Sequence, residues 1–324
     1  MNTQALFRVV LMGTLLTQAS GCVEGQDDAG ADHTVAAAGL DTARMLEDVA
    51  RLSHDSMAGR AVGTPGNAAA RRMIAERFQS LGVTPLGETF LQPFTYTADD
   101  ETREGTNVIG YVPGTERPNE FLIVTAHFDH LGVRNGQVYN GADDNASGTA
   151  ALLALAEWFS ENPGLHSIAF AAVDAEEQGL QGARAFVTNP PIPLGQIALN
   201  VNLDMISHSD SVLYAAGTHH YPYLRSYLED VAERSDIVLR FGHDSPDLGE
   251  NDDWTNASDH GPFHSIGVSF IYFGVEDHPD YHQPTDDFER INRQFYVDAV
   301  ETILDAIREF DRHLEELAVT RRGR

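Results

Sequence analysis

Side chains that bind metal ions or transfer protons stand directly after several apolar segments of this sequence. These segments occupy residues 121–126, 168–173, 197–203 and 268–273. The polar residues that follow them in turn are His127 and Asp129, Glu176 and Glu177, Asp204 and, beyond a loop, His282. An acidic pair, Asp143 and Asp144, lies just before a segment with helical spacing. Imidazole and carboxylate groups together suit zinc, so the pattern indicates a metal centre.

The apolar segments, together with residues 107–112, are predicted to be strands that position these side chains. Helical patterns alternate with them and cover residues 42–52, 65–81, 146–159, 180–187, 221–234 and 293–314. Strands alternating with helices predict an α/β fold, in which a mostly parallel mixed sheet is covered by helices on both faces. Ligands of such sheets bind beyond the carboxyl ends of the strands, and there we expect the polar residues to meet.

Each polar residue taken alone has a more ordinary interpretation. A histidine after a strand is more often a surface or core residue, and a Glu-Glu pair usually begins a solvated helix. Asp143 and Asp144 could cap a helix, and Asp204 could form a turn. The metal centre is the better hypothesis because all of these residues fall at the same edge of one predicted sheet.

The composition restricts the function further. The 324 residues suffice for one large α/β domain. The 49 acidic residues outnumber 21 basic ones, all arginine, and the formal charge is −28. This charge repels nucleic-acid phosphates, so we expect no nucleic-acid binding; a solvated acidic surface is its simplest explanation. A single cysteine permits no disulfide within the chain, and no apolar stretch reaches the roughly 18 residues of a membrane-spanning helix.

The N-terminal residues indicate export. Residues 1–21 combine one positive charge, Arg8, with an apolar run and with small residues before Cys22, and they resemble a bacterial lipoprotein signal. Residues 22–40 are rich in Ala, Gly and Asp and are predicted to be a flexible tether to a folded domain at 41–324. We therefore expect an exported protein with a lipid at Cys22, attached to the cell envelope at the outer membrane or periplasm of a Gram-negative host. Signal cleavage without a lipid and a cytoplasmic chain with a chance apolar N-terminus are the alternatives.

The order of short motifs along the chain resembles the family of co-catalytic di-zinc exopeptidases. The motifs are HFDHLG, NGADDNASG, DAEEQGLQGARAF, NLDM, SDHGPF and YHQPTDD. The resemblance extends from residue 52 to the last predicted helix. This family includes secreted bacterial aminopeptidases, glutamate carboxypeptidase and the glutaminyl cyclases. Residues 41–324 would accordingly be a zinc peptidase domain with the zinc-dependent exopeptidase fold.

The resemblance implies a site for two zinc ions per chain. Asp143 would bridge the two ions. His127 and Asp204 would complete one site, and Glu177 and His282 the other. Each ion would have three protein ligands and an open position shared with a water molecule.

The resemblance also assigns roles to three neighbouring residues. Glu176 would be the general base that takes a proton from the water and passes it to the leaving amine. The carboxylate of Asp129 would accept the second ring N–H of His127 and fix its tautomer. Asp144 would follow a cis peptide bond.

The leading hypothesis is an aminopeptidase that acts on peptides, with a glutaminyl cyclase, a carboxypeptidase and a non-catalytic binding protein as alternatives. A carboxypeptidase needs a cation to hold a free carboxylate. The chain has no lysine, and the spacing of Arg134, Arg184 and Arg290 marks none of them as a carboxylate clamp. The acidic residues at 249–254 could instead attract a substrate ammonium group, although a solvated turn is the simpler explanation of that loop.

Overall fold

The computed structural model describes residues 39–249 and 252–322. The predicted signal at 1–21, Cys22 and nearly all of the predicted tether lie outside the described residues. No helix in the described ranges has the length and apolar character needed to cross a membrane.

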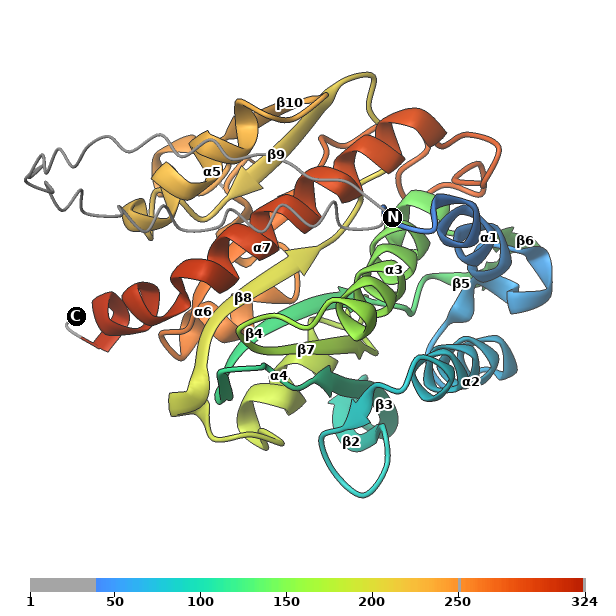
Figure 1. Ribbon diagram of the computed structural model, residues 1–324. Coiled ribbons are helices and arrows are strands. Elements are labelled where there is room, and N and C mark those ends of the chain that lie inside the picture. Colours follow the sequence, from blue (N-terminus) through green and yellow to red (C-terminus); the bar gives the residue numbers. More distant parts are fainter. Residues whose placement is uncertain (1–38, 250–251, 323–324) are drawn as a thin grey trace, which may run out of the picture. The chain divides into compact units, whose positions relative to one another are not determined.

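A mixed sheet organises the described part of the chain, where it has nine strands (Figure 1). In order across the sheet these are β1 (Thr84–Pro85), β3 (Glu101–Val112), β7 (His166–Val173), β4 (Arg117–His127), β8 (Ile197–Leu203), β11 (Ser269–Gly274), β9 (Val212–Ala216) and β10 (Val238–Phe241), with β2 (Leu91–Ala98) paired to β3. The four central strands, β7, β4, β8 and β11, are parallel. Antiparallel strands flank them on both sides, since β3 pairs with β7 and β9 with β11.

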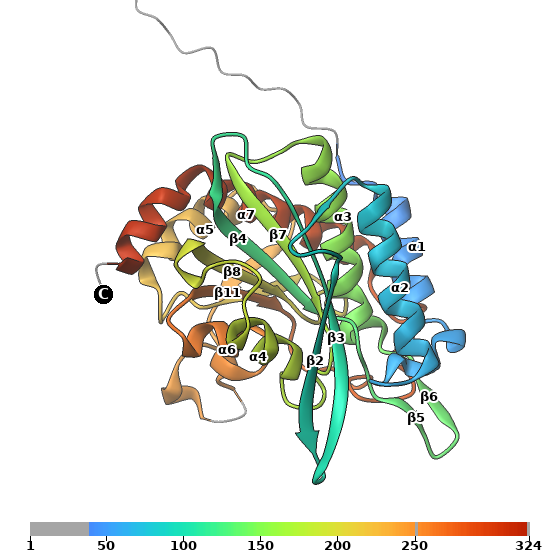
Figure 2. The ribbon, with the colours of Figure 1, turned by 90° about the horizontal axis from the view of Figure 1, so that it is seen from below.

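Helices cover both faces of this sheet (Figure 2). On one face α3 (Gly148–Glu161) and α7 (Arg293–Arg322) contact the central strands, and on the other α4 (Gln181–Thr188) and α6 (His260–Ser265) pack beside each other. The outer helices are α1 (Thr42–Leu52) and α2 (Pro65–Ser80), which contact α3, and α5 (Arg225–Ala232), which contacts α7. Every residue of β7, β8 and β11 is buried, as expected for parallel strands covered on both faces. The predicted fold class is confirmed.

The register of the central strands places their carboxyl ends side by side. Thr125 of β4 pairs with Asn202 of β8, so His127 and Asp204 leave the sheet next to each other. His127 also pairs with Val173 of β7, and the segment carrying Glu176 begins just beyond that pair. The parallel register therefore gathers residues that lie far apart in the sequence.

The prediction differs from the structure mainly at the edges of the sheet and at helix starts. The sequence does not predict β1, β2, β9 and β10 as strands, nor the small hairpin of β5 (Gly132–Arg134) and β6 (Gln137–Tyr139). The predicted helix at 146–159 begins two residues later, because 142–147 forms a wider turn with non-helical residues inside it. The predicted helix at 221–234 is a short 3-10 turn, Pro222–Leu224, followed by α5.

Candidate metal centre

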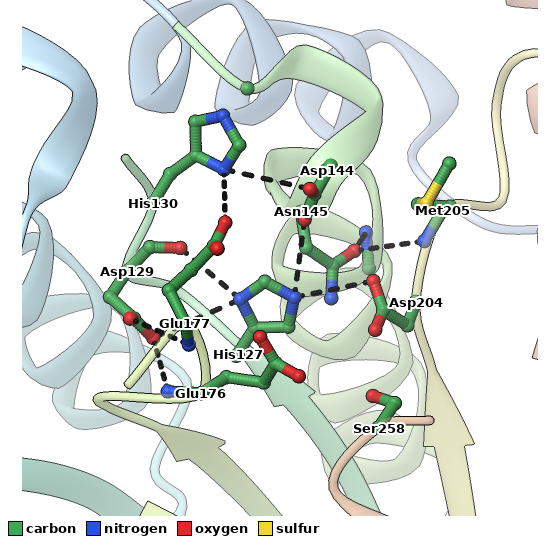
Figure 3. A network of polar contacts seen from close by, with 12 residues as sticks. His127, Asp129, His130, Asp144, Asn145, Glu176, Glu177, Asp204, Met205 and Ser258 are labelled. Atoms are coloured by element: carbon green, nitrogen blue, oxygen red, sulfur yellow. Dashed lines mark hydrogen bonds and ion pairs between the residues drawn. The ribbon is translucent and has the colours of Figure 1, made fainter. Parts of the chain in front are cut away.

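Two groups of ligand atoms lie at the carboxyl edge of the central strands. One group consists of His127, Asp144 and Asp204, and the other contains Asp144 with Glu177 and the neighbouring His130 (Figure 3). Asp144 belongs to both groups. It stands in the turn before α3, whereas the other residues follow β4, β7 and β8.

The two carboxylate oxygens of Asp144 contact different groups. Oδ1 lies 3.3 Å from Nε2 of His127, which is itself 3.2 Å from Oδ1 of Asp204. Oδ2 lies 3.1 Å from Nε2 of His282, which is 3.5 Å from Oε2 of Glu177. Two ligand atoms that bind one zinc ion at tetrahedral angles lie about 3.3 Å apart, so each of these four pairs of atoms has the spacing of two zinc ligands. Asp144 has the position of a carboxylate that bridges two ions.

The prediction that Asp143 bridges the metal ions is therefore wrong by one residue. Oδ1 of Asp143 accepts hydrogen bonds from the backbone N–H and the hydroxyl of Ser207, both at 2.7 Å. Its Oδ2 lies 3.0 Å from Nε2 of His278. Neither Ser207 nor His278 belongs to either of the two groups. The cis peptide bond joins Asp144 to Asn145, so its predicted position is also one residue too early.

Asp129 has a different contact from the one predicted. Its Oδ1 is 3.8 Å from Nδ1 of His127, too far for a hydrogen bond, and it is the backbone carbonyl of Asp129 that accepts from Nδ1 at 3.1 Å. This contact still fixes the tautomer that leaves Nε2 of His127 free to bind a metal ion. The Asp129 carboxylate accepts the backbone N–H groups of Glu176 at 3.0 Å and Glu177 at 3.3 Å. Asp129 therefore holds the segment that carries the expected base and one expected ligand.

Glu176 is a largely buried residue that lies among other carboxylates. Burial raises its pKa well above the usual value; His127 opposes this effect, and Asp259 and Asp204 add to it. Burial also raises the pKa of Asp259 to about 7. Both oxygens of this fully buried carboxylate lack a hydrogen-bond partner among the described residues. A bound divalent cation would act in the opposite direction on these pKa values, because it favours the ionised carboxylates.

The electrostatics and the donor atoms both fit a bound cation. Burial alone would raise the pKa of Asp144, but the adjacent His130, His127 and His282 hold it well below its usual range. Zinc ions would also hold the pKa of Asp144 low, and nitrogen and carboxylate oxygen atoms are their usual ligands. Of the predicted site residues, the structure brings together His127, Glu176, Glu177, Asp204 and His282, with Asp144 in place of Asp143.

Three residues near the site were not assigned from the sequence: Arg60, His130 and Asp286. Arg60 is fully buried, and its guanidinium donates to the carbonyls of Leu52, Phe128, Asn140 and Gly141. It thereby ties the HFDH loop to the loop that leads to Asp144. The buried carboxylate of Asp286 accepts the backbone N–H groups of Asp143 and Asp144. His130 and Asp286 stand in recognised motifs, but nothing in the sequence showed that they and Arg60 meet here.

A third group of ligand-type side chains, His208, His278 and Asp280, lies beside the site. The carboxylate of Asp280 already accepts hydrogen bonds from Thr285 and Arg290. The rings of His208 and His278 stack at 3.7 Å, and Nε2 of His278 is already 3.0 Å from Oδ2 of Asp143. We assign no metal to this group. It supports the site indirectly, because His278 contacts Asp143.

Residues 107–307 match the sequence model described as Peptidase family M28. Among curated proteins, Aminopeptidase YwaD of Bacillus subtilis (strain 168) is 31% identical over 217 residues, which cover 63% of this chain and 44% of that protein. The Alkaline phosphatase isozyme conversion protein of Escherichia coli (strain K12) is 28% identical over 190 residues, or 54% of each chain. The chain thus spans about half the length of these relatives.

Several solved structures share the fold. A zinc aminopeptidase from Bacillus subtilis, BSAP, has a TM-score of 0.68 at 17% identity and covers 82% of this chain and 94% of its own. A Zn-dependent exopeptidase from Parabacteroides distasonis has a TM-score of 0.67 at 18% identity, covering 84% and 99%. Glutaminyl cyclase from Bacteroides thetaiotaomicron also has a TM-score of 0.67, at 16% identity and with the same coverage. Identities this low establish the fold, and aminopeptidases and a cyclase share it.

Proposed function

The chain belongs to peptidase family M28, and from this premise we propose that it is a zinc-dependent aminopeptidase with two metal ions per chain. The observation that carries the proposal is the placement of Asp144, whose two oxygens face two separate sets of ligand atoms. The similarity to a bacterial aminopeptidase over 63% of this chain supports the same reaction class.

His127, Asp144 and Asp204 would hold one ion, and Asp144, Glu177 and His282 the other. When bound, the ions polarise the scissile carbonyl and lower the pKa of a water molecule.

Glu176 is the proposed general base. Its backbone N–H is fixed by Asp129, and its side chain lies near His127 and Asp204, beside the first of the two sets of ligands. From this position the carboxylate takes a proton from the attacking water and delivers it to the leaving amine. Its neighbour Glu177 faces His282 instead. The adjacent glutamates thus divide proton transfer and metal binding between them.

The charges around the site favour a substrate ammonium group over a substrate carboxylate. Arg60 is fully buried with its guanidinium bonded to backbone carbonyls, so it cannot bind a substrate. Arg290 pairs with Asp280, Arg184 bonds to a backbone carbonyl, and Arg134 lies over the ring of Tyr139. None of the arginines near the motifs is therefore placed as a carboxylate clamp. By contrast, Asp259 is a buried carboxylate without a hydrogen-bond partner in the described part of the chain.

Matched peptides test the proposed reaction. Purified protein, zinc-loaded or treated with chelator, is incubated with one tetrapeptide in an N-acetylated and a C-amidated form, and products are identified by mass spectrometry. We expect stepwise loss of N-terminal residues from the amidated peptide only, and only with zinc. Cleavage of the last bond of the acetylated peptide would identify a carboxypeptidase instead. Cyclisation of an N-terminal glutaminyl peptide without hydrolysis would identify a glutaminyl cyclase.

We also propose export and lipid attachment at Cys22. The support is the sequence alone: one positive charge, an apolar run and small residues precede this cysteine. In a bacterial host, wild-type protein should fractionate with membranes and the Cys22→Ser variant should be released. Identical fractionation of the two proteins would rule out the lipid.

A further inference from the structure

His130 is a fully buried histidine at the site that the proposed reaction does not use. It lies in the HFDH loop after β4, three residues beyond His127. Its Nδ1 is 2.8 Å from Oε1 of Glu177 and 3.7 Å from Oδ2 of Asp144, and its side chain has no exposed surface (Figure 3). The ring thus lies against two of the three residues that would hold the second ion.

The close approach of His130 to Glu177 does not have the alignment of a good hydrogen bond. Although 2.8 Å is a suitable distance, Nδ1 of His130 and Oε1 of Glu177 both lack a hydrogen-bond partner within the described ranges. The ring is therefore not oriented to donate along the line between these atoms. Two ligands of one metal ion have this relationship, because both point at the ion and not at each other. A buried polar atom without a partner costs about 1–3 kcal/mol, which an ion bound here would offset.

The position of the His130 ring is determined by its surroundings. A Cβ atom on Gly141 would lie 2.1 Å from the carbonyl oxygen of Asp144 and 2.5 Å from Cδ2 of His130, so both the turn and the ring pack against a position that only glycine can fill. Arg60 donates to the carbonyls of Phe128 and Gly141, the former two residues before His130 and the latter beside its ring. The fold thus builds a specific place for an imidazole next to Glu177.

We propose that His130 is a fourth protein ligand, through Nδ1, of the metal ion held by Asp144, Glu177 and His282. This inference rests on the two-metal site of the proposed function. The distances from Nδ1 to Glu177 and Asp144, 2.8 and 3.7 Å, lie on either side of the roughly 3.3 Å expected between two ligands of one zinc ion.

A fourth protein ligand makes the two sites unequal. Structural zinc sites have four protein ligands, whereas catalytic sites have three and keep one position open. The ion beside His130 and His282 would then have four protein ligands, one more than the ion at the other site. The group of His127, Asp144 and Asp204 keeps the open position. The site with four protein ligands should bind metal more tightly and fill first, and the first equivalent of metal should stabilise the protein.

Cadmium-113 NMR tests this assignment without depending on catalysis. Apoprotein is titrated with ¹¹³Cd²⁺, and histidine ring protons are correlated with each cadmium resonance through scalar coupling. We expect one resonance coupled to both His130 and His282, complete at one equivalent, and a second coupled to His127. The His130→Asn variant identifies which correlation belongs to His130. It should also lower the cadmium affinity of the site at Glu177 and His282 by more than the 10–100-fold typical of residues that only support a ligand. His166→Asn, which removes a buried histidine elsewhere, should leave all three correlations unchanged.

The outcomes separate this inference from the proposed function. Coupling of His282 and His127 without coupling of His130 would overturn the inference and leave the two-metal site intact. A loss of 100-fold or less in His130→Asn, with both cadmium resonances retained, would also overturn it. If no histidine couples to cadmium, both the inference and the proposed metal site fail.

Discussion

Asp143 and Asp144 are adjacent carboxylates with separate roles, and replacing each with asparagine should distinguish them. Asp144 faces His127 on one side and His282 on the other, so its two oxygens are needed for both ions. Asp143 faces Ser207 and His278 and supports the loop instead. An asparagine is nearly the same size as an aspartate, so each substitution removes the charge and one acceptor oxygen with little change in packing.

The structure gives a rough magnitude for each variant. The amide oxygen of Asp143→Asn can still accept from Ser207, but the charge-assisted contact with His278 is lost. Such a bond contributes about 1.5–3 kcal/mol, so the free energy of unfolding of the apoprotein should fall by about the same amount. Zinc at about 1,000 times its dissociation constant adds about 4 kcal/mol per site to this free energy. Asp143→Asn should keep that gain, whereas Asp144→Asn should lose most of it.

The assay is urea unfolding of each protein with chelator and with zinc, combined with zinc analysis after dialysis. We expect wild type and Asp143→Asn to hold two zinc ions and to gain equally from zinc, with the variant starting from a lower value. Asp144→Asn should hold fewer than two ions. If Asp143→Asn lost zinc while Asp144→Asn kept both ions, the assignment of the bridging carboxylate would be refuted.

Three further substitutions test other parts of the account. Glu176→Gln should keep both zinc ions but lose on the order of 10²–10⁴-fold in turnover with an amidated tetrapeptide, and near wild-type turnover would exclude it as the base. Arg60→Met leaves buried carbonyls without their donor, so the free energy of unfolding should fall by about 3–5 kcal/mol; a change within 0.5 kcal/mol in a urea titration would contradict this. Burial alone would lower the pKa of His166, but the hydrogen bond and charge of Asp311 raise it above its usual value. The contribution of this His166–Asp311 pair to the free energy of unfolding is therefore complete below about pH 6.5, the pKa in the unfolded chain. It is lost as the pH rises through the higher pKa of the folded protein. Wild type should therefore exceed His166→Gln in unfolding free energy by more at pH 6 than at pH 9, and a difference independent of pH would argue against the pair.

The central strands were predictable because burial on both faces leaves a plain sequence signal. β7, β8 and β11 are wholly buried, so each reads as an apolar run followed by polar residues that emerge at one edge. β10 lies at the edge of the sheet, has only four residues and includes an exposed arginine, so it has no such signal. Its pairing with β9 is a tertiary feature that no local pattern specifies.

The metal ligands were predictable to the loop but not always to the residue. His127, Glu177 and Asp204 have positions set by strand ends, whereas Asp143 and Asp144 lie in an irregular turn without periodicity. Their orientation depends on Asp286, whose carboxylate binds both of their backbone N–H groups from 143 and 142 residues away. Long-range contacts of this kind cannot be read from local spacing.

The role of His130 was not predictable for the same reason. Its ring is positioned by the room at Gly141 and by hydrogen bonds from Arg60, which is 68 residues from Phe128 and 81 from Gly141. The sequence places a histidine in the HFDH motif but does not show which way its ring points.

Locating zinc by anomalous diffraction from crystals grown with the metal tests the central claim most directly. The account predicts two peaks, one on each side of the Asp144 carboxylate. One peak should lie between His127 and Asp204 and the other beside Glu177 and His282. A single peak under zinc excess, or a zinc ion bound to Asp143 in place of Asp144, would contradict the account.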